Sequence, residues 1–561
     1  MVKTFYLSNG LKVAMEYMPQ YRSVSIGVWV KAGSVNENKQ TNGIAHVIEH
    51  MLFKGTEKRT ARELADAMTE IGGNVDAYTT KEYTCFYTKT LYEHLFYAID
   101  ILGDMLSNSK IDENDLKKEL GVIAEEIDMY DDSPEDIVHE RLQEVIWREH
   151  SLGYLISGDK QTVLGFKRQD VLDFMKQYYT ADRMTIAISG YFEEARVLED
   201  LENCFGGIAP GYKASLLEAN AQIAKAKYYP SLYMQHKDVE QVHMIIAFES
   251  LDYYDPERYI LSVVNSLLGG NVNSRLFQTI REEMGLSYAI YSYGGSYEKG
   301  GLFHIYAAVH PNQVRPVLKA VVDIIQKLKK ELVSDRELYI VKESVKTDLI
   351  ISDESTYNRI SNYGKSYIHG ETIETVEEAA EKIGQVTAEE VRAFVQKHFD
   401  LSQMSLSLVG DLKTLPREEM EELWMTYRTE KSMRITLVTV GKIKEKFFVQ
   451  AIEEYSKRLS RYCKLEIIEV ADEKTPDKAS EALELQIKEK EGERILKSIK
   501  DDSYVIALAI EGKMRSSEEL AARIEKLGIG GESHLTFVIG GSLGLAPAVL
   551  NRAVKNLVFH Q

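Results

Sequence analysis

The sequence places two histidines and a glutamate at a spacing suited to metal chemistry, in His46-Val-Ile-Glu49-His50. On an α-helix, residues four positions apart project from one face, so His46 and His50 can offer two imidazole nitrogens to one metal ion. Glu49 lies on the adjoining face, where it can take a proton from a water molecule that the metal activates. The alternative is a surface helix with two solvated histidines, but so specific a pattern rarely arises by chance.

A catalytic zinc ion usually takes three protein ligands, so a carboxylate from a second helix is expected. The segment Asp115–Tyr130 is predicted to form that helix, and its apolar stripe must face the core. At about 100° per residue, Glu125 points to solvent, while Glu126 and Glu119 lie at the edge of the stripe. We therefore expect Glu126 to be the third ligand, with an exposed acidic helix face as the alternative. Glu119, on the same side, can hydrogen-bond a ligand histidine. The stripe consists of Leu116, Leu120, Ile123, Ile127 and Tyr130.

The elements that must position these residues follow from local patterns. Two β-rich runs, Lys3–Leu7 and Leu11–Tyr17, flank Asn9-Gly10 and predict a hairpin, because Asn-Gly supplies the positive φ angles of a tight turn. A strand is expected over Val24–Ala32. A capping box predicts a helix over Ala61–Ile71. Further helices are expected at about 93–107 and 113–131, the second closed by a Ser-Pro pair.

The order of these elements recurs later in the chain. Residues 205–230 form a Gly- and Pro-containing stretch typical of a linker. Beyond it, a strand at Val242–Phe248 and a helix ending in Gly269-Gly270 repeat the order seen at Val24–Gly55. We therefore expect two similar α+β domains, at residues 1–215 and 228–430.

The pattern changes at Met433 to a strict alternation of strands and helices. Helices are expected at about 445–462, 479–499 and 517–527, between strands that are each followed by a crossover. Such alternation is typical of a parallel α/β sheet, so residues 433–561 are expected to form a third domain. The expected strands are Ile435–Val440, Leu465–Val470, Tyr504–Ile510 and Leu535–Ile539.

Composition limits the class of protein. The chain has 561 residues, 44% of them hydrophobic and 28% charged, which is typical of a folded globular protein of several domains. The net charge of -19 is uneven: residues 433–561 carry 21 Lys and Arg against 20 Asp and Glu, which leaves 47 against 67 before them. The acidic part is a poor partner for nucleic acid, because phosphates would be repelled. Three scattered cysteines and the lack of a long apolar run predict a cytoplasmic protein without a membrane segment.

The first 430 residues resemble a known family. The motif HVIEH, the following FKGT, the stretch IGGNVDAYTTKEYTCFY and a glutamate 76 residues after His50 are similar to the pitrilysin and mitochondrial-processing-peptidase family of zinc metallopeptidases. The resemblance implies one zinc ion per chain, held by His46, His50 and Glu126. It also implies that Glu49 is the general base and Glu119 its supporting acid.

The second half of this region has no zinc motif, since the equivalent helix reads ILSVVNSLLGG. It does contain RLFQTIREEMGLSYAIYS, where Arg281 and Tyr288 would share a helical face if the helix continued. The resemblance implies that both bind substrate backbone and stabilise the tetrahedral intermediate. It also implies a clamshell homodimer in which they act on the zinc of the partner chain. A surface charge and a packed ring are the alternatives.

The C-terminal region resembles a second family. Segments such as MRITLVTVGKIKEKF, ALAIEGKMRSSEELA and FVIGGSLGL are similar to SPOUT-class methyltransferase H, which modifies a pseudouridine of 23S ribosomal RNA. This implies S-adenosylmethionine near Leu508 and Gly540, and ribosomal RNA as partner, although a tight turn also explains the glycines. Members of that family continue beyond the point where this sequence ends, so we expect a pocket without one wall and an impaired methyltransferase.

The sequence therefore predicts a zinc-dependent endopeptidase that hydrolyses peptides or unfolded segments, with a methyltransferase-like domain attached. Substrate is expected to add as a strand near Asn74–Thr80. One alternative makes S-adenosylmethionine-dependent methylation of 23S ribosomal RNA the main activity. Another is a non-catalytic scaffold of the processing-peptidase type, against which the intact HVIEH motif argues.

Overall fold

The chain forms two compact units, residues 1–420 and 421–561, in this computed structural model. The residues described are 2–73, 75–211, 224–429, 434–459, 463–476, 479–500, 503–529 and 534–558. The boundary residues 215, 430 and 433 that the sequence suggested, and Asn74 of the expected substrate strand, lie outside them. The expected mixed α+β architecture with a parallel-sheet unit at its end is confirmed.

The first half of unit 1 is a sheet with the strand order β1-β2-β6-β3-β5-β4 and helices packed on one face. Its strands are β1 (Lys3–Tyr6), β2 (Lys12–Tyr17), β3 (Ser23–Val30), β4 (Val75–Thr79), β5 (Thr84–Leu91) and β6 (Met184–Gly190). Its helices are α1 (Ile44–Leu52), α2 (Ala61–Glu70), α3 (Leu95–Asn108), α4 (Glu113–Asp132), α5 (Pro134–Ile146), α6 (Lys160–Leu164), α7 (Arg168–Tyr178) and α8 (Glu194–Phe205).

The second half has a sheet with the order β7-β11-β8-β10-β9. Its strands are β7 (Leu232–His236), β8 (Val242–Glu249), β9 (Ser287–Tyr297), β10 (Gly300–Val309) and β11 (Ser405–Gly410). Its helical segments are α10 (Arg258–Leu268), the π-helix η5 (Phe277–Glu283), α11 (Val314–Lys330), α12 (Asp335–Asp353), α13 (Thr356–Ile368), α14 (Val376–Gln385) and α15 (Ala388–His398).

The two halves share one topology. If β2 to β6 are matched in chain order with β7 to β11, the spatial orders of the two sheets become identical. The pairings match as well: β2 and β6 are parallel, as are β7 and β11, and the remaining neighbours are antiparallel. The same matching places α10 at the position of α1. The duplication that the sequence suggested is therefore present, and its second copy of the motif helix has no histidine.

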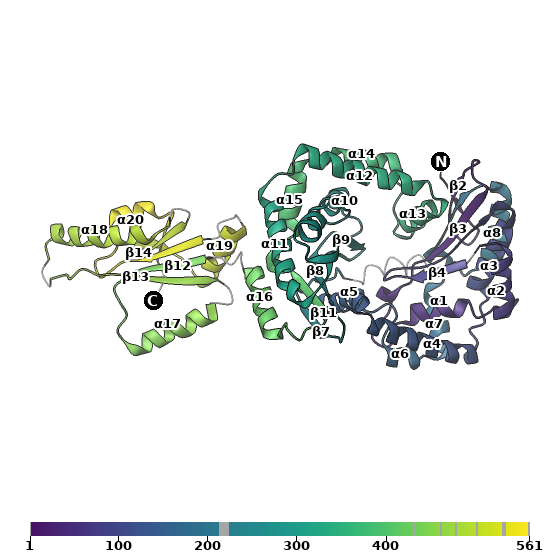
Figure 1. Cartoon of the computed structure of the whole chain (residues 1–561), viewed down its shortest axis with the longest axis horizontal. Helices are drawn as coiled ribbons and strands as arrows, with labels where there is room; N and C mark the ends of the chain where they lie inside the picture. The colour runs from purple at the N-terminus through teal and green to yellow at the C-terminus, as the bar shows by residue number, and fades with distance from the viewer. Residues whose placement is uncertain are drawn as a thin grey trace. The chain divides into compact units, whose positions relative to one another are not determined.

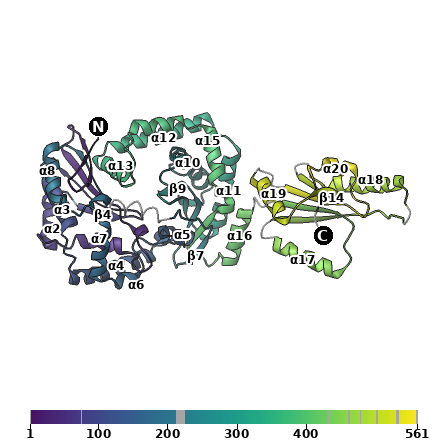
Figure 2. The same ribbon diagram turned by 180° about the vertical axis from the view of Figure 1, so that it is seen from behind.

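The two halves exchange one helix each. Helix α5 of the first half packs on β11 and β8, whereas α13 of the second half packs on β6 and β3, the matching strands of the first sheet. Figure 1 and Figure 2 both show α13 against the first sheet. Each exchanged helix buries apolar side chains in the other half, Trp147 and Leu142 near α5, Ile360 and Tyr363 on α13. The halves are thus held together by a shared core.

Helix α4 ends at Ser133-Pro134, as expected from the sequence, and the same dipeptide also starts α5. Ser133 closes α4 and also caps α5, because its hydroxyl accepts a hydrogen bond from the Asp136 backbone. Pro134 occupies the first position of α5, where its missing N–H is not needed. The dipeptide therefore marks a bend between two helices.

Unit 2 contains a parallel sheet with the order β13-β12-β15-β14-β16. Its strands are β12 (Arg434–Val440), β13 (Lys464–Val470), β14 (Tyr504–Met514), β15 (His534–Ile539) and β16 (Lys555–Val558). Its helices are the tail of α16 (Arg417–Thr429), then α17 (Lys446–Leu459), α18 (Glu481–Ser498), α19 (Ser517–Ile529) and α20 (Pro547–Arg552). In the described part of the whole chain, no helix combines the length and apolar character needed to cross a membrane.

Candidate zinc centre

Helix α1 carries the histidines on a framework of buried apolar side chains. It starts after Gly43, whose φ of 98° lies in the left-handed region that favours glycine. Its apolar residues pack into the core beneath the first sheet, so the orientation of the helix is fixed. His46 is buried with them, while Glu49 and His50 are partly exposed. The buried apolar residues of α1 are Ile44, Ala45, Val47, Ile48, Met51 and Leu52.

The structure brings His46, His50 and Glu126 together. The two imidazole Nε2 atoms are 3.2 Å apart. Glu126 on α4 lies 3.5 Å from His50 Nε2 through one oxygen and 3.9 Å from His46 Nε2 through the other. All three ligand atoms lie within 4.8 Å of one another.

These distances fit a zinc ion. Two ligands bound to zinc at about 2.0–2.1 Å with tetrahedral angles lie about 3.3 Å apart. The two Nε2 atoms also face each other across that distance, which is unfavourable for two neutral imidazole lone pairs and favourable around a shared cation. Two nitrogens and one carboxylate form a ligand set typical of catalytic zinc, with a fourth position left open.

Glu119 does not belong to the three ligand residues but contacts one of them, His50. Its Oε1 is 3.0 Å from Nδ1 of His50, and its Oε2 forms an ion pair of 2.7 Å with Lys54. An acceptor at Nδ1 fixes the tautomer in which Nε2 presents its lone pair to a metal. Glu125, by contrast, is exposed on α4, on the side that the helical pattern predicted.

Glu49 points to the same centre and is held by a threonine. The hydroxyl of Thr79, the last residue of β4, donates a hydrogen bond to Glu49 Oε2. Burial raises the pKa of Glu49, although this hydrogen bond and the nearby His50 act in the opposite direction. A carboxylate with a raised pKa is a stronger base, which suits it to accept a proton.

The two histidines differ in their protonation. Burial, reinforced by His50, lowers the pKa of His46 to about 4, so its imidazole is neutral at physiological pH. Burial also opposes the charged form of His50, but the hydrogen bond to Glu119 and the charges of Glu126 and Glu49 outweigh it and raise its pKa. The carboxylates around His50 thus create a site that attracts positive charge.

The start of α1 is fixed by a residue from the loop that directly precedes it. Glu37 accepts hydrogen bonds from the backbone N–H groups of Gly43 and Ala45, at 2.8 and 2.9 Å, and from the side chain of Asn42 at 2.8 Å. The first turn of the helix therefore has an acceptor that its own N-cap glycine cannot supply. Burial raises the pKa of Glu37 to about 7, against the hydrogen bonds and the charge of Lys81.

Comparison with known proteins agrees with this centre. The description "Insulinase (Peptidase family M16)" matches residues 12–160, and "Peptidase M16 inactive domain" matches residues 165–345. The uncharacterized zinc protease YmxG of Bacillus subtilis is 38% identical over 416 residues, which are 74% of this chain and 100% of that protein. The chain belongs to the insulinase family of zinc proteases, M16. A further relative, an uncharacterized zinc protease of Streptomyces coelicolor, is 32% identical and covers 73% of this chain and 90% of its own length.

Solved structures show the M16 fold as well. A protease from Helicobacter pylori aligns with a TM-score of 0.67 at 20% identity, over 73% of this chain and 99% of that chain. The M16 inactive domain from Pseudomonas fluorescens aligns with a TM-score of 0.68 at 18% identity, over 73% and 98%. Residues 433–561 match the description "Predicted SPOUT methyltransferase". The chain is thus an M16 zinc metallopeptidase that carries a SPOUT methyltransferase domain.

Arg281 and Tyr288 of this M16 chain do not share a helix. The helical segment ends before Gly285, whose φ of 63° breaks it, and Tyr288 is the second residue of β9. The condition under which the two would share a helical face is therefore not met. They are nevertheless neighbours, because the Arg281 guanidinium lies 5.1 Å from the centroid of the Tyr288 ring, which is 79% exposed.

In the SPOUT domain, Leu508 and Gly540 lie at one edge of the parallel sheet. Leu508 pairs in register with Ile539, the last residue of β15, and Gly540 follows directly. A side chain at Gly540 would come within 2.7 Å of the Gly544 backbone, so the loop needs glycine there for close packing. Gly540 thus follows the carboxyl end of β15, and Leu508 lies level with that end on the adjacent strand β14, near the side of the sheet where ligands of α/β sheets bind.

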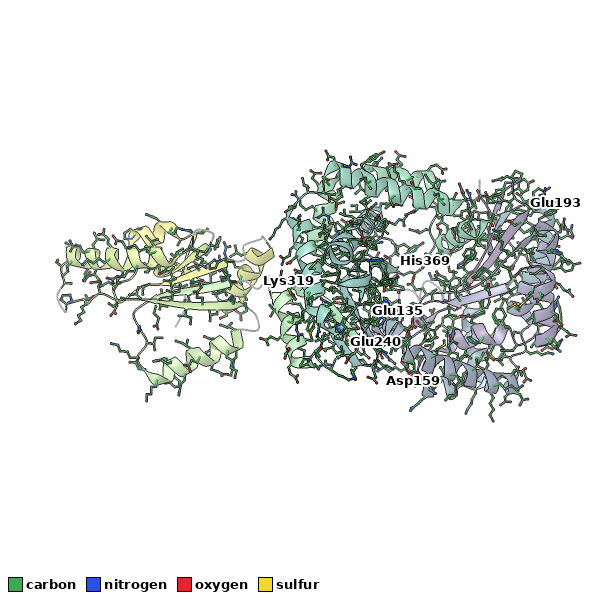
Figure 3. All side chains as sticks on the ribbon, in the orientation of Figure 1. Glu135, Asp159, Glu193, Glu240, Lys319 and His369 are labelled. Atoms are coloured by element: carbon green, nitrogen blue, oxygen red, sulfur yellow. The ribbon has the colours of Figure 1, made fainter. Side chains whose placement is uncertain are left out.

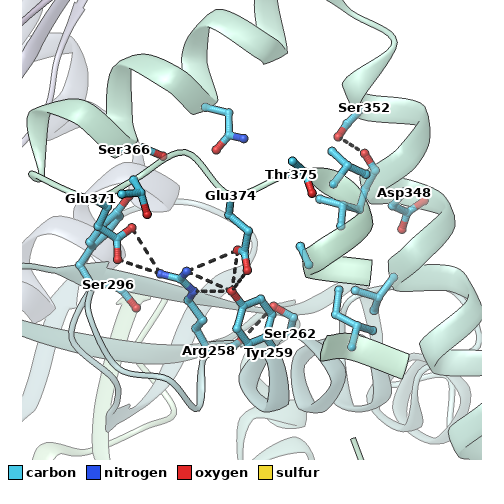
Figure 4. Close-up of a pocket in the computed structure, with 18 residues that line it drawn as sticks. Arg258, Tyr259, Ser262, Ser296, Asp348, Ser352, Ser366, Glu371, Glu374 and Thr375 are labelled. Atoms are coloured by element: carbon cyan, nitrogen blue, oxygen red, sulfur yellow. Dashed lines mark hydrogen bonds and ion pairs between the residues drawn. The ribbon is translucent and has the colours of Figure 1, made fainter. Parts of the chain in front are cut away.

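A separate cavity of about 610 Å³ lies in the second half of the M16 region, among α10, α12, α13 and α14. Figure 4 shows Arg258 bridging Glu371 and Glu374, with Tyr259 bonded to Glu374. Lys382 pairs with Glu374 at 2.5 Å, so two cations balance the two glutamates, and none of the zinc-centre residues lines the cavity. We read it as a structural network that ties residues 369–375 to α10.

Three contacts of the centre escaped the sequence analysis: Thr79, Lys54 and Glu37. Thr79 and Lys54 meet partners that are distant in sequence, whereas Glu37 meets Asn42, Gly43 and Ala45 nearby. All three belong to residue types that are common on surfaces. The only sequence signal for Glu37 was its position shortly before the histidine motif. Nothing in the sequence paired Thr79 with Glu49.

Proposed function

We propose that this chain hydrolyses peptide bonds in extended peptides or unfolded segments at one zinc ion held by His46, His50 and Glu126. The observation that carries the proposal is the convergence of these three side chains beside Glu49. A bound zinc ion supplies Lewis acidity, which polarises the scissile carbonyl and acidifies a water molecule. The proposal assigns the zinc protease function of the family to these particular residues of the chain.

Glu49 acts as the general base in this proposal. It takes a proton from the attacking water and passes it to the leaving amine. Glu119 orients His50 through Nδ1, and Lys54 keeps Glu119 ionised and in place. Burial of His46 keeps its imidazole neutral and able to act as a ligand.

Substrate is proposed to bind along β4. In the described residues, β4 pairs only with β5 and forms the edge of the first sheet next to α1. An extended peptide can add to such an edge as a further strand. Its backbone would then be aligned beside the centre, which favours unfolded chains over folded proteins.

Arg281 and Tyr288 are proposed to complete the site of a second copy of this chain in a clamshell homodimer. Arg281 and Tyr288 contact each other, and Tyr288 is exposed. Both features fit groups that reach the active site of a second copy and there bind the oxyanion and the backbone carbonyls of its substrate. A cytoplasmic location belongs to the same proposal, because Cys85, Cys204 and Cys463 are free, as expected in a reducing compartment.

The test is the hydrolysis of a quenched fluorescent peptide by wild type and Glu49→Gln, with zinc content measured on the same samples. We expect the variant to retain zinc and to lose turnover by more than about 100-fold, because it keeps the ligands but lacks the base. Unchanged turnover would remove Glu49 from the mechanism, and a wild type without turnover would refute the proposed function.

A second candidate function concerns unit 2. The alignment of Leu508 and Gly540 at one sheet edge supports binding of S-adenosylmethionine there, with ribosomal RNA as the methyl acceptor. Titration of the full chain with S-adenosylmethionine by calorimetry tests it, with Gly540→Val as the variant. Saturable binding that is lost in the variant is expected, whereas equal heats for both proteins would exclude this site.

A further inference from the structure

We infer that Thr79 is a positioning residue of the peptidase, which ties the general base to the strand that receives substrate. The inference rests on the proposed function of Glu49. It starts from one contact: the Thr79 hydroxyl donates a hydrogen bond to Glu49 Oε2. That contact joins α1 to β4, two elements that are 30 residues apart in sequence at these positions.

The direction of this hydrogen bond follows from the neighbouring hydroxyl. Thr84 lies 3.5 Å from Thr79 through the two Oγ1 atoms, and its own proton is donated to the Ala32 carbonyl at 2.9 Å. The single proton of Thr79 is therefore directed to the carboxylate, which is the stronger acceptor. Because Oε2 of Glu49 is occupied by this hydrogen bond, Oε1 is the oxygen that accepts the proton from the attacking water.

The position of Thr79 in the sheet also links Glu49 to the strand that is proposed to bind substrate. Alternation along β4 turns Ala77 and Thr79 to the face that packs against α1, while Tyr78 packs on the opposite face. The backbone of the same strand forms the open edge of the sheet. Thr79, the last residue of β4, therefore positions the carboxylate of Glu49 relative to a peptide that is paired with β4.

The hairpin that follows Thr79 is held tightly enough to serve as a reference. Lys81 is buried and donates to the Tyr154 carbonyl. Glu82 accepts a hydrogen bond of 2.7 Å from the Glu298 backbone in the second half. Glu298 in turn binds Lys31 at 2.6 Å and His369 at 3.0 Å.

His369 lies between the two halves in Figure 3. The hairpin is thus anchored in both halves of unit 1. Gly33 allows this packing, because a Cβ there would meet the Thr80 and Lys81 carbonyl oxygens at 2.5 and 2.6 Å. Thr79 accordingly has little freedom to follow Glu49 if that side chain moves.

The test compares Thr79→Val, Thr79→Ser and Thr90→Val in peptide hydrolysis. Thr79→Val removes the hydroxyl at nearly constant volume, so kcat should fall by about 10- to 100-fold while KM and zinc content stay unchanged. Thr79→Ser restores the hydroxyl and should restore most of kcat. Thr90→Val is the matched control: it removes a buried hydroxyl that donates to the Ile71 carbonyl on the same hairpin, and should keep kcat.

A readout without turnover accompanies these assays. In zinc-free protein, Thr79→Val should lower the thermal unfolding midpoint in the Glu49 background and change it less in the Glu49→Ala background, because the contact is already absent there. The inference is overturned if Thr79→Val retains full kcat, if serine fails to rescue it, or if the two backgrounds respond equally. Wild-type turnover with an inactive Glu49→Gln would then leave the proposed function intact, whereas an inactive wild type would refute both.

Discussion

At the residue scale, the centre combines side chains that sequence spacing selects with side chains that only the fold brings in. His46, Glu49 and His50 follow from the pattern on one helix, and the apolar stripe of a second helix favoured Glu126 over Glu125. The structure places Glu126 at 3.5 Å from His50 Nε2 and leaves Glu125 exposed. Lys54 and Thr79 were not foreseen, because their partners are set by tertiary packing, and Glu37 was not, because its contacts depend on the conformation of a loop and not on helical spacing.

The contrast between these two glutamates gives a matched pair of variants. Glu126→Gln should weaken zinc binding by more than about 100-fold, since even loss of an indirect partner of a ligand costs about 10- to 100-fold. Glu125→Gln changes the adjacent, exposed residue and should bind zinc as wild type does. Competition with a chromogenic chelator measures both. Equal losses in the two variants would remove Glu126 from the ligand set.

At the element scale, most helices and strands of the structure lie where local patterns predict them. The hairpin around Asn9-Gly10 and the capped helix α2 are confirmed. Ser133-Pro134 ends α4 as expected and also starts α5. Gly285 stops the helix before Tyr288, so the condition for a helical face shared by Arg281 and Tyr288 is not met. Strand order was beyond sequence analysis, because it depends on pairings between distant segments.

The cap of α1 by Glu37 makes a prediction about pH. The pKa of Glu37 in the folded protein is about 7, above its ordinary value of 4.5. A carboxyl group with a raised pKa contributes stability that is fully present below pH 4.5 and is lost as the pH rises through 7. The groups that interact with it electrostatically are Lys81 on the β4–β5 turn and Tyr178 on α7.

Glu37→Gln removes this titration. The free energy of unfolding of wild type, relative to the variant, should therefore fall by about 3 kcal/mol between pH 4.5 and pH 7. Urea unfolding of both zinc-free proteins at pH 5 and pH 8 measures the difference. A difference that stays constant, or grows with pH, would contradict a buried carboxyl at the start of α1.

At the scale of the whole molecule, the exchanged helices α5 and α13 make unit 1 one folded body. The sequence suggested the duplication through its repeated order of elements, but not that each half supplies a helix to the other. The exchange is secured by charge as well as by apolar contacts: Arg359 on α13 holds both oxygens of Glu16 on β2, at 2.8 and 2.9 Å. Glu16 is buried and also accepts a hydrogen bond from Tyr363 at 2.6 Å.

Breaking this pair should be costly. Arg359→Leu leaves a buried carboxylate without its cation, so the free energy of unfolding should fall by about 3–5 kcal/mol. The double variant Glu16→Leu/Arg359→Leu should recover part of that loss, because it also removes the buried carboxylate of Glu16 and leaves only the partly exposed Asp353 without its ion pair to Arg359. Arg62→Leu disrupts an exposed pair with Asp66 and should change stability by less than about 1 kcal/mol. Denaturant unfolding ranks the variants; equal effects for Arg359 and Arg62 would refute the buried pair.

The most direct measurement of the central claim is anomalous diffraction at the zinc absorption edge from crystals of the zinc-loaded protein. The account predicts one peak per chain, about 2.0–2.1 Å from Nε2 of His46, Nε2 of His50 and a carboxylate oxygen of Glu126. A zinc-loaded crystal with no peak among these three side chains, or with its zinc held elsewhere, would contradict it.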